Sequence, residues 1–71
     1  MDPKSHLQEV VQSQGGSTPQ YKVLSEEGPD HDKTFSVGVY VDGELKGQGD
    51  GPSKQAAQVV AATAALAQYD N

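Results

Sequence analysis

An alternation of side-chain polarity over residues 34–41 constrains the fold more than any other feature. Apolar side chains occupy every second position of this segment, at Phe35, Val37, Val39 and Val41. This period of two predicts a strand with one buried face. Asp42-Gly43 follows directly and is a strong signal for a two-residue hairpin turn. We therefore expect residues 44–49 (ELKGQG) to return as an antiparallel partner strand.

One more strand and a helix are predicted before this hairpin. Residues 19–24 (PQYKVL) alternate in the same way and predict a first strand. Asp2 is a favourable helix cap and Pro3 a favourable first helical residue. Apolar side chains with helical spacing follow at Leu7, Val10 and Val11. The pair Gly15-Gly16 is expected to end this helix.

A second helix is predicted after the hairpin, with Ser53 as its cap and a span from Lys54 to about Gln68. Its expected apolar stripe consists of Ala57, Val60, Ala61, Ala64 and Ala65. The predicted fold class is α+β in the order α-β-β-β-α. Only one face of the three-stranded antiparallel sheet is expected to be apolar, so both helices should pack on that face. We expect a single domain over residues 2–69, cut from a longer chain.

Composition limits the function. The 71 residues include no cysteine, which excludes disulfides and thiolate metal sites and fits a reducing, cytoplasmic location. Five basic residues against ten acidic ones give a net charge of −5, which by itself argues against nucleic acid or an anionic membrane as a partner. The longest apolar run, residues 59–67, is too short to span a bilayer.

Residues 47–54 (GQGDGPSK) place glycines between a strand and a helix. Such a turn exposes backbone amides at the positive end of a helix and can hold a phosphate group. A dinucleotide fold would need a further parallel strand, and a P-loop would need Gly-Lys before Ser or Thr, so neither fits. A tight turn with a helix cap is the alternative.

Two further candidates are polar. Asp30-His31-Asp32 offers metal-ligand side chains, but consecutive loop residues point in different directions and no partner cluster is evident. A solvated loop, or a histidine that hydrogen-bonds a ligand, are the alternatives. The first helix carries a polar stripe that is either its wet side or a binding surface: Ser5, Gln8, Glu9 and Gln12.

Together, the element order, the SHLQEVVQ opening, the GPDH loop and the GxGxGxSK segment before an alanine-rich helix resemble the double-stranded RNA-binding domain. The similarity is closest to the C-terminal domain of bacterial ribonuclease III and runs from about Asp2 to Gln68. It implies two minor-groove contacts, one from the stripe of the first helix and one from the loop residues Gly28, Pro29, Asp30 and His31. Ser53 and Lys54 would hold phosphates across the major groove between them, and Lys33 is a further candidate for a phosphate.

Double-stranded RNA suits such a surface. Its wide minor groove displays 2′-hydroxyls, which short polar side chains can contact, and such a module reads about 16 base pairs by shape. One departure weakens the match, because the family usually has a lysine cluster where this chain reads Lys54-Gln55-Ala56-Ala57-Gln58. With Asp50 nearby, we expect weak phosphate binding. Asp30 and Asp32 have no evident role.

The resemblance implies a non-catalytic module that positions duplex RNA for a separate Mg²⁺-dependent nuclease domain, in a parent enzyme that is a homodimer through that other domain. No metal, small-molecule cofactor or membrane partner is expected for this segment. A degenerate protein-interaction or dimerisation module is the alternative, favoured by the missing lysines and the acidic charge. An enzyme built on Asp30-His31-Asp32 is the least favoured possibility.

Overall fold

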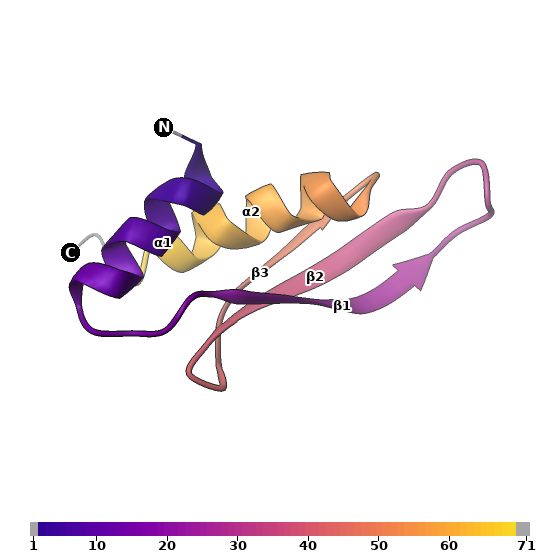
Figure 1. Ribbon diagram of the computed structural model, residues 1–71. Coiled ribbons are helices and arrows are strands. Elements are labelled where there is room, and N and C mark those ends of the chain that lie inside the picture. Colours follow the sequence, from indigo (N-terminus) through magenta and orange to yellow (C-terminus); the bar gives the residue numbers. More distant parts are fainter. Residues whose placement is uncertain (1, 70–71) are drawn as a thin grey trace.

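The computed structural model describes residues 2–69. Its elements are α1 (Pro3–Ser13), β1 (Gln20–Glu27), β2 (Thr34–Val41), β3 (Glu44–Gly51) and α2 (Lys54–Leu66). The strands form one antiparallel sheet in the order β1-β2-β3. Figure 1 shows both helices on the same side of this sheet, which confirms the predicted α-β-β-β-α fold. No helix within residues 2–69 is long and apolar enough to cross a membrane.

Both helices begin at the predicted caps. The Asp2 carboxylate accepts a hydrogen bond from the Ser5 backbone amide at 2.9 Å, and Ser53 Oγ accepts one from the Ala56 amide at 3.0 Å. Each cap therefore satisfies an N–H group that has no partner inside the helix. The end of α2 comes at Leu66, earlier than the expected Gln68. Gln68 instead lies in a turn, where its side-chain amide donates to the Lys46 carbonyl at 2.5 Å.

The strands differ from the prediction in length and regularity. The first strand continues to Glu27 rather than ending near Leu24, because a bulge between Val23 and Ser25 interrupts the alternation that was used to find it. A second irregularity, at Lys46 in β3, shifts the pairing with β2. Both bulges lie on edge strands, where a disrupted ladder disfavours pairing with another chain.

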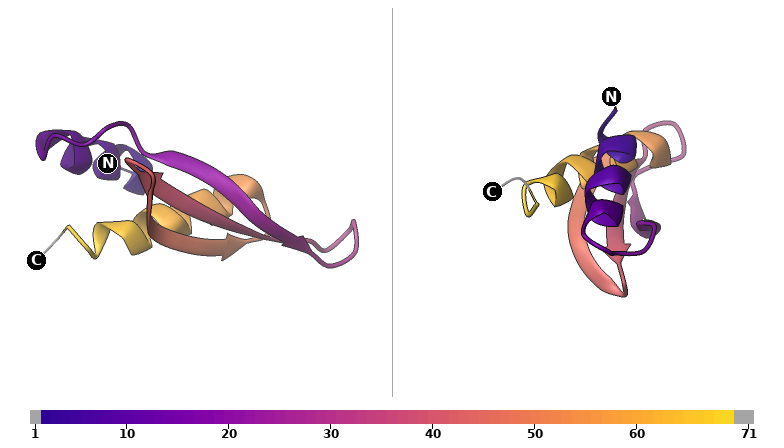
Figure 2. Two further views of the ribbon diagram at one scale, coloured as in Figure 1. Left: turned by 90° about the horizontal axis from the view of Figure 1, so that it is seen from below. Right: turned by 60° about the vertical axis from the view of Figure 1, so that its left-hand side comes forward.

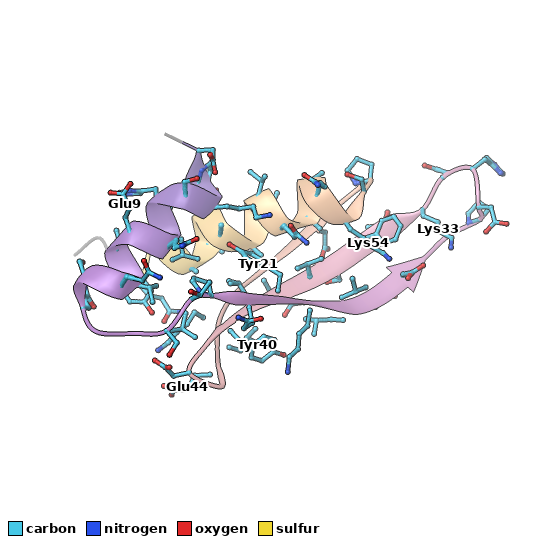
Figure 3. All side chains as sticks on the ribbon, in the orientation of Figure 1. Glu9, Tyr21, Lys33, Tyr40, Glu44 and Lys54 are labelled. Carbon is cyan, nitrogen blue, oxygen red and sulfur yellow. The ribbon has the colours of Figure 1, made fainter. Side chains whose placement is uncertain are left out.

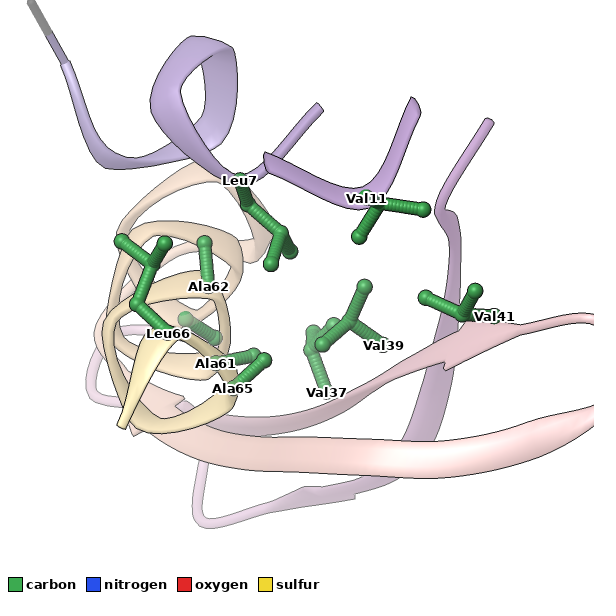
Figure 4. Packing of buried hydrophobic residues seen from close by; sticks show 10 residues of the cluster. Leu7, Val11, Val37, Val39, Val41, Ala61, Ala62, Ala65 and Leu66 are labelled. Atoms are coloured by element: carbon green, nitrogen blue, oxygen red, sulfur yellow. The ribbon is translucent and has the colours of Figure 1, made fainter. Parts of the chain in front are cut away.

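The core lies between the sheet and the helices. Figure 4 shows Leu7 and Val11 of α1 pointing toward Val39 and Val41 of β2. The predicted stripe on α2 was partly wrong, because α2 contacts both the sheet and α1 and so buries a different arc from the one expected. Of the expected members, Val60 and Ala64 are exposed, and in their place Ala62 and Leu66 are buried.

Glycines in β3 set how closely α2 approaches the sheet. Figure 2 shows α2 running alongside β3. A Cβ atom built at Gly47 would lie 2.4 Å from the Ala61 carbonyl oxygen, and one at Gly49 would lie 2.4 Å from the Ala61 amide nitrogen. Side chains at these positions would therefore collide with the backbone of α2. The glycines thus allow the backbones of β3 and α2 to approach closely, and alanines on α2 complete the contact.

The opposite face of the sheet is less polar than predicted. A Cβ atom at Gly38 would lie within 3.2 Å of side-chain atoms of Leu24, Tyr40 and Leu45, so these three side chains converge over this glycine. Lys22 lies above the Tyr40 ring, 4.6 Å from its centroid. The expectation that only one face is apolar was wrong in this respect. Both helices nevertheless pack on the face that carries the buried valines of β2.

Candidate nucleic-acid interface

The polar stripe on α1 is exposed along its whole length. The side chains of Gln8 and Glu9 make no hydrogen bond or ion pair within residues 2–69, so they can contact a ligand. Ser5 is partly engaged, because its hydroxyl donates to the Asp2 carboxylate at 3.0 Å. Gln12 donates to the Thr18 hydroxyl at 3.3 Å. The stripe therefore offers two free side chains at its centre and two partly held ones at its ends.

The Asp2 cap is also the most perturbed carboxylate. Hydrogen bonds from the Ser5 amide and then from the Ser5 hydroxyl lower the pKa of Asp2. This carboxylate stays ionised at neutral pH and lies at the end of the stripe, so it does not itself attract phosphate.

A groove of about 460 Å³ lies between α1, the start of β1 and α2, which sequence reasoning did not anticipate. Lys4 connects its sides, because its ammonium donates to the Gln58 side-chain oxygen at 2.6 Å and lies 5.1 Å from the Tyr21 ring centroid. The Tyr21 hydroxyl is buried without a hydrogen-bond partner among residues 2–69, and burial raises the pKa of Tyr21. The sequence held a signal for this contact of Lys4. Lys4 precedes Leu7 and Val11 at helical spacing, which places it on the packed side of α1.

The β1–β2 loop has a defined turn at its tip. The Asp32 amide donates to the Pro29 carbonyl at 2.9 Å, which closes a turn with Asp30 and His31 at its centre. Gly28 has a φ of +95°, and a Cβ atom there would lie 2.5 Å from the Asp32 carbonyl oxygen. His31 is exposed at the tip. The predicted loop residues therefore stand together beyond the end of the sheet (Figure 1).

Lys33 does not project freely from this loop. Its ammonium lies 3.2 Å from the Glu26 carboxylate and 3.7 Å from the Asp30 carboxylate. Asp30, which had no evident role, thus has a cationic neighbour, whereas Asp32 contributes its backbone to the turn.

The N-terminus of α2 carries the predicted cap and lysine. Lys54 is exposed, and its ammonium lies 6.0 Å from the Phe35 ring centroid without a carboxylate partner among residues 2–69. The first turn of α2 has no acidic residue. The free amides and the positive end of the helix dipole therefore remain available to an anion.

The glycine-rich segment before α2 is strand for most of its length. β3 includes the expected residues 44–49 and continues to Gly51, and Gly47, Gly49 and Gly51 lie against the backbone of α2. Asp50 alternates with the glycines that contact α2, so it lies on the opposite face of the sheet, where its carboxylate accepts from the Ser36 hydroxyl at 2.7 Å. The Asp50 carboxylate therefore points away from the face of β3 that contacts α2.

Gln55 and Gln58, the two neutral residues near Lys54, are not equivalent. Gln58 is half-buried and accepts the hydrogen bond from Lys4, whereas Gln55 is exposed. Only Gln55 is thus an open position where a lysine could be added without disturbing a contact between the helices.

The candidate residues lie in three groups along the length of the molecule. Figure 3 labels one residue near each group, with Glu9 on α1, Lys54 at the start of α2 and Lys33 at the loop. The longest dimension of the molecule is 41 Å. Among residues 2–69, no cluster of three or more histidine, aspartate or glutamate side chains could hold a metal ion. The arrangement offers hydrogen-bonding groups at both ends and a cationic helix terminus between them.

Comparisons with known proteins agree on one family. The family model described as the double-stranded RNA binding motif matches residues 3–69. Ribonuclease 3 of Pelotomaculum thermopropionicum is 52% identical over 69 residues, which cover 97% of this chain and 29% of that protein. Ribonuclease 3 of Enterococcus faecalis is 50% identical over 66 residues, covering 93% of this chain and 29% of that protein. The chain thus spans under a third of these curated relatives.

Solved structures show the same fold. A structure of Arabidopsis HYL1, described in relation to miRNA processing, superposes with a TM-score of 0.82 at 34% identity and covers 97% of each chain. The structure of Dicer from Pichia stipitis gives a TM-score of 0.74 at 29% identity, over 92% of this chain and 31% of that one.

Proposed function

The chain belongs to the double-stranded RNA-binding domain family, and from this premise we propose that it is the substrate-binding module of a ribonuclease III. Duplex RNA is the partner that the family implies. The observation that carries the proposal is the spacing of three groups along the 41 Å length, two with hydrogen-bonding side chains and one with a cation between them. Two minor grooves separated by one major groove present this sequence of chemistries on A-form RNA.

The proposed contacts follow from which side chains are free. Gln8 and Glu9 contact 2′-hydroxyls and base edges in one minor groove, with Ser5 and Gln12 at the margins. A carboxylate is suitable there because it accepts a hydrogen bond from a hydroxyl. His31 enters the next minor groove from the tip of its loop, and Gly28, Pro29 and Asp30 shape that tip.

The phosphate contact is proposed to come from the start of α2. Lys54, the Ser53 hydroxyl and the free amides of the first turn face the major groove between the two minor-groove contacts. Because this region offers one free lysine, the affinity should depend only weakly on salt. We expect the logarithm of the binding constant to fall with a slope of about −1 to −2 against the logarithm of the salt concentration.

The rest of the parent enzyme is also part of the proposal. The relatives named Ribonuclease 3 are more than three times as long as this chain, since it covers 29% of them. We propose that the remaining length holds a Mg²⁺-dependent nuclease domain that forms the homodimer and cleaves the duplex in the cytoplasm. This segment then binds substrate without cleaving it.

A titration of the domain with a duplex of about 20 base pairs at two salt concentrations tests the proposal. Duplex RNA should bind, whereas duplex DNA and single-stranded RNA should bind much more weakly, because neither presents 2′-hydroxyls across two minor grooves. Failure to bind duplex RNA at low salt would refute the function. Self-association of a domain that does not bind RNA would support the protein-interaction alternative.

Added lysines test the location of the phosphate contact. Gln55→Lys should raise affinity and steepen the salt slope by about one, because the exposed side chain lies next to Lys54. Gln48→Lys is the control, since it makes the same charge change on the opposite face of the sheet and removes only an exposed hydrogen bond from Gln48 to the Ser36 hydroxyl. Equal gains from the two variants would show a general charge effect and remove α2 from the interface. Lys54→Ala should weaken binding to every duplex sequence similarly.

A further inference from the structure

One ammonium group joins both sides of the β1–β2 loop. Glu26 belongs to the end of β1, Asp30 to the turn, and Lys33 precedes β2. The Lys33 ammonium lies 3.2 Å from the Glu26 carboxylate and 3.7 Å from the Asp30 carboxylate. The Lys33 and Glu26 side chains are 34% and 41% exposed, so this pair is partly withdrawn from solvent, whereas the Asp30 side chain is fully exposed.

The backbone closes the same loop independently. The hydrogen bond from Asp32 to Pro29 forms the turn, and Gly28 supplies the positive φ that brings the chain into it. His31 has no side-chain hydrogen bond or ion pair within residues 2–69, so its position depends on this turn and on the groups that brace it. Lys33 is the side chain that connects the turn to the strand beneath it.

We infer that Glu26, Lys33 and Asp30 form a clamp that positions His31, and that Lys33 is a positioning residue rather than a phosphate contact. The inference rests on the proposed function, because it concerns how the loop meets the RNA. An ammonium beside two carboxylates has little net charge to offer a phosphate. The clamp also gives a reason for two carboxylates beside a surface that binds a polyanion, which simple charge repulsion would disfavour.

The clamp and a phosphate contact by Lys33 predict opposite changes in RNA affinity for Glu26→Gln. If Lys33 contacts phosphate, removal of the competing carboxylate should tighten RNA binding. If the clamp positions His31, the same change should weaken binding by about two- to fivefold, the range expected for a partly exposed ion pair. Glu27→Gln is the matched control. It removes an identical charge from the adjacent residue, which makes no ion pair within residues 2–69. This control should leave affinity unchanged or slightly tighter.

Lys33→Met separates the two roles through salt dependence. A lost clamp should lower affinity by a similar two- to fivefold and leave the salt slope unchanged, because no counterion is released at this site. A slope that falls by about one would overturn the proposal and make Lys33 a phosphate contact. Asp30→Asn should weaken binding less than Glu26→Gln, since Asp30 is fully exposed. Tighter binding by Asp30→Asn would exclude Asp30 from the clamp.

A charge swap provides the rescue. The double variant Glu26→Lys/Lys33→Glu re-forms the pair between positions 26 and 33 with reversed direction, although Asp30 then faces a carboxylate at position 33. It should therefore recover part of the affinity that either single change loses. If position 33 needs a cation for phosphate, the swap should instead bind no better than Lys33→Met. Urea unfolding of each variant checks that the fold is intact.

A measurement without RNA keeps the clamp distinct from the proposed function. Heteronuclear ¹⁵N relaxation of the free domain should show that residues 30–32 are ordered in the wild type and more mobile in Glu26→Gln and Lys33→Met. The swap should restore part of this order. Unchanged relaxation in the single variants would overturn the clamp. If the wild type fails to bind duplex RNA while these relaxation changes occur, the proposed function fails and the clamp remains a feature of the loop.

Discussion

Gly49→Ala tests whether glycine in β3 is required for the approach of α2. A Cβ atom at Gly49 would lie 2.4 Å from the Ala61 amide nitrogen, 2.6 Å from Val60 Cβ and 2.7 Å from the Val60 carbonyl carbon. Ordinary contacts begin near 3.4 Å, so the helix or the strand must retreat by about 1 Å. Two of the three atoms belong to the backbone of α2, so a change of side-chain rotamer cannot relieve the collision.

The expected cost follows from that retreat. A gap of about 1 Å forfeits up to about half of the dispersion energy at each affected contact, and overpacking typically costs about 1–3 kcal/mol. Alanine also restricts the unfolded chain, which offsets about 0.4–1 kcal/mol. We expect a net loss of about 1–2 kcal/mol in the free energy of unfolding, which for a domain of this size lowers Tm by about 5–15 °C.

Urea and thermal unfolding measure this loss, with Gly38→Ala as the matched control. Gly38 is also in the sheet, but its added Cβ would meet only side-chain atoms of Leu24, Tyr40 and Leu45 on the outer face, at 2.9–3.2 Å. These partly exposed side chains can move aside, so the control should lose clearly less stability than Gly49→Ala. If Gly49→Ala is as stable as the wild type, or no less stable than the control, the backbone contact with α2 does not limit the fold.

Changes at three further positions test the core, the cap and the buried hydroxyl. Leu7→Ala removes a fully buried side chain and should cost about 2–5 kcal/mol in the free energy of unfolding by urea, and a cost under about 1 kcal/mol would place Leu7 outside the core. Ser53→Ala should cost about 1 kcal/mol through loss of the cap, whereas Ser53→Asp should retain stability but weaken RNA binding; equal stability of the alanine and aspartate variants would exclude the capping role. Burial raises the pKa of Tyr21 above its ordinary value of 10.0, so the unfolded chain loses this proton at a lower pH than the folded domain does. The free energy of unfolding is therefore at its full value below pH 10 and falls as pH rises through the folded pKa. Tyr21→Phe should abolish this alkaline loss in unfolding curves from about pH 8 to about pH 11, and an unchanged pH profile would assign it to another group.

Local patterns predicted most of the fold because the physics behind them is local. The alternation in residues 34–41, the Asp42-Gly43 turn and the caps at Asp2 and Ser53 each depend on neighbours within a few positions. These features were sufficient for the order of elements and the layer arrangement. The same locality explains the short first strand that we predicted, since the bulge at Leu24 breaks the period by which a strand is found.

Sequence motifs named candidate site residues, but they did not predict the charges and rings that surround them in the structure. Motif matching named His31, Lys33 and Lys54 alike, but the structure surrounds them differently. Lys33 lies beside two carboxylates and Lys54 beside an aromatic ring. Sequence proximity suggested that Asp50 would oppose an anion near Lys54, yet strand alternation places it on the other face of the sheet.

The sequence by itself thus determined the elements and their order, because hydrophobic period, turn residues and caps act over short stretches of chain. It also determined which side chains are present at the two proposed minor-groove contacts. Only the tertiary structure decided which charges are free. The link from Lys4 to Gln58 spans 54 positions, and the packing of Gly49 on Ala61 depends on how two elements meet. Such contacts form only after the chain has folded, and the folded structure likewise leaves Lys54 beside an aromatic ring and Lys33 beside two carboxylates.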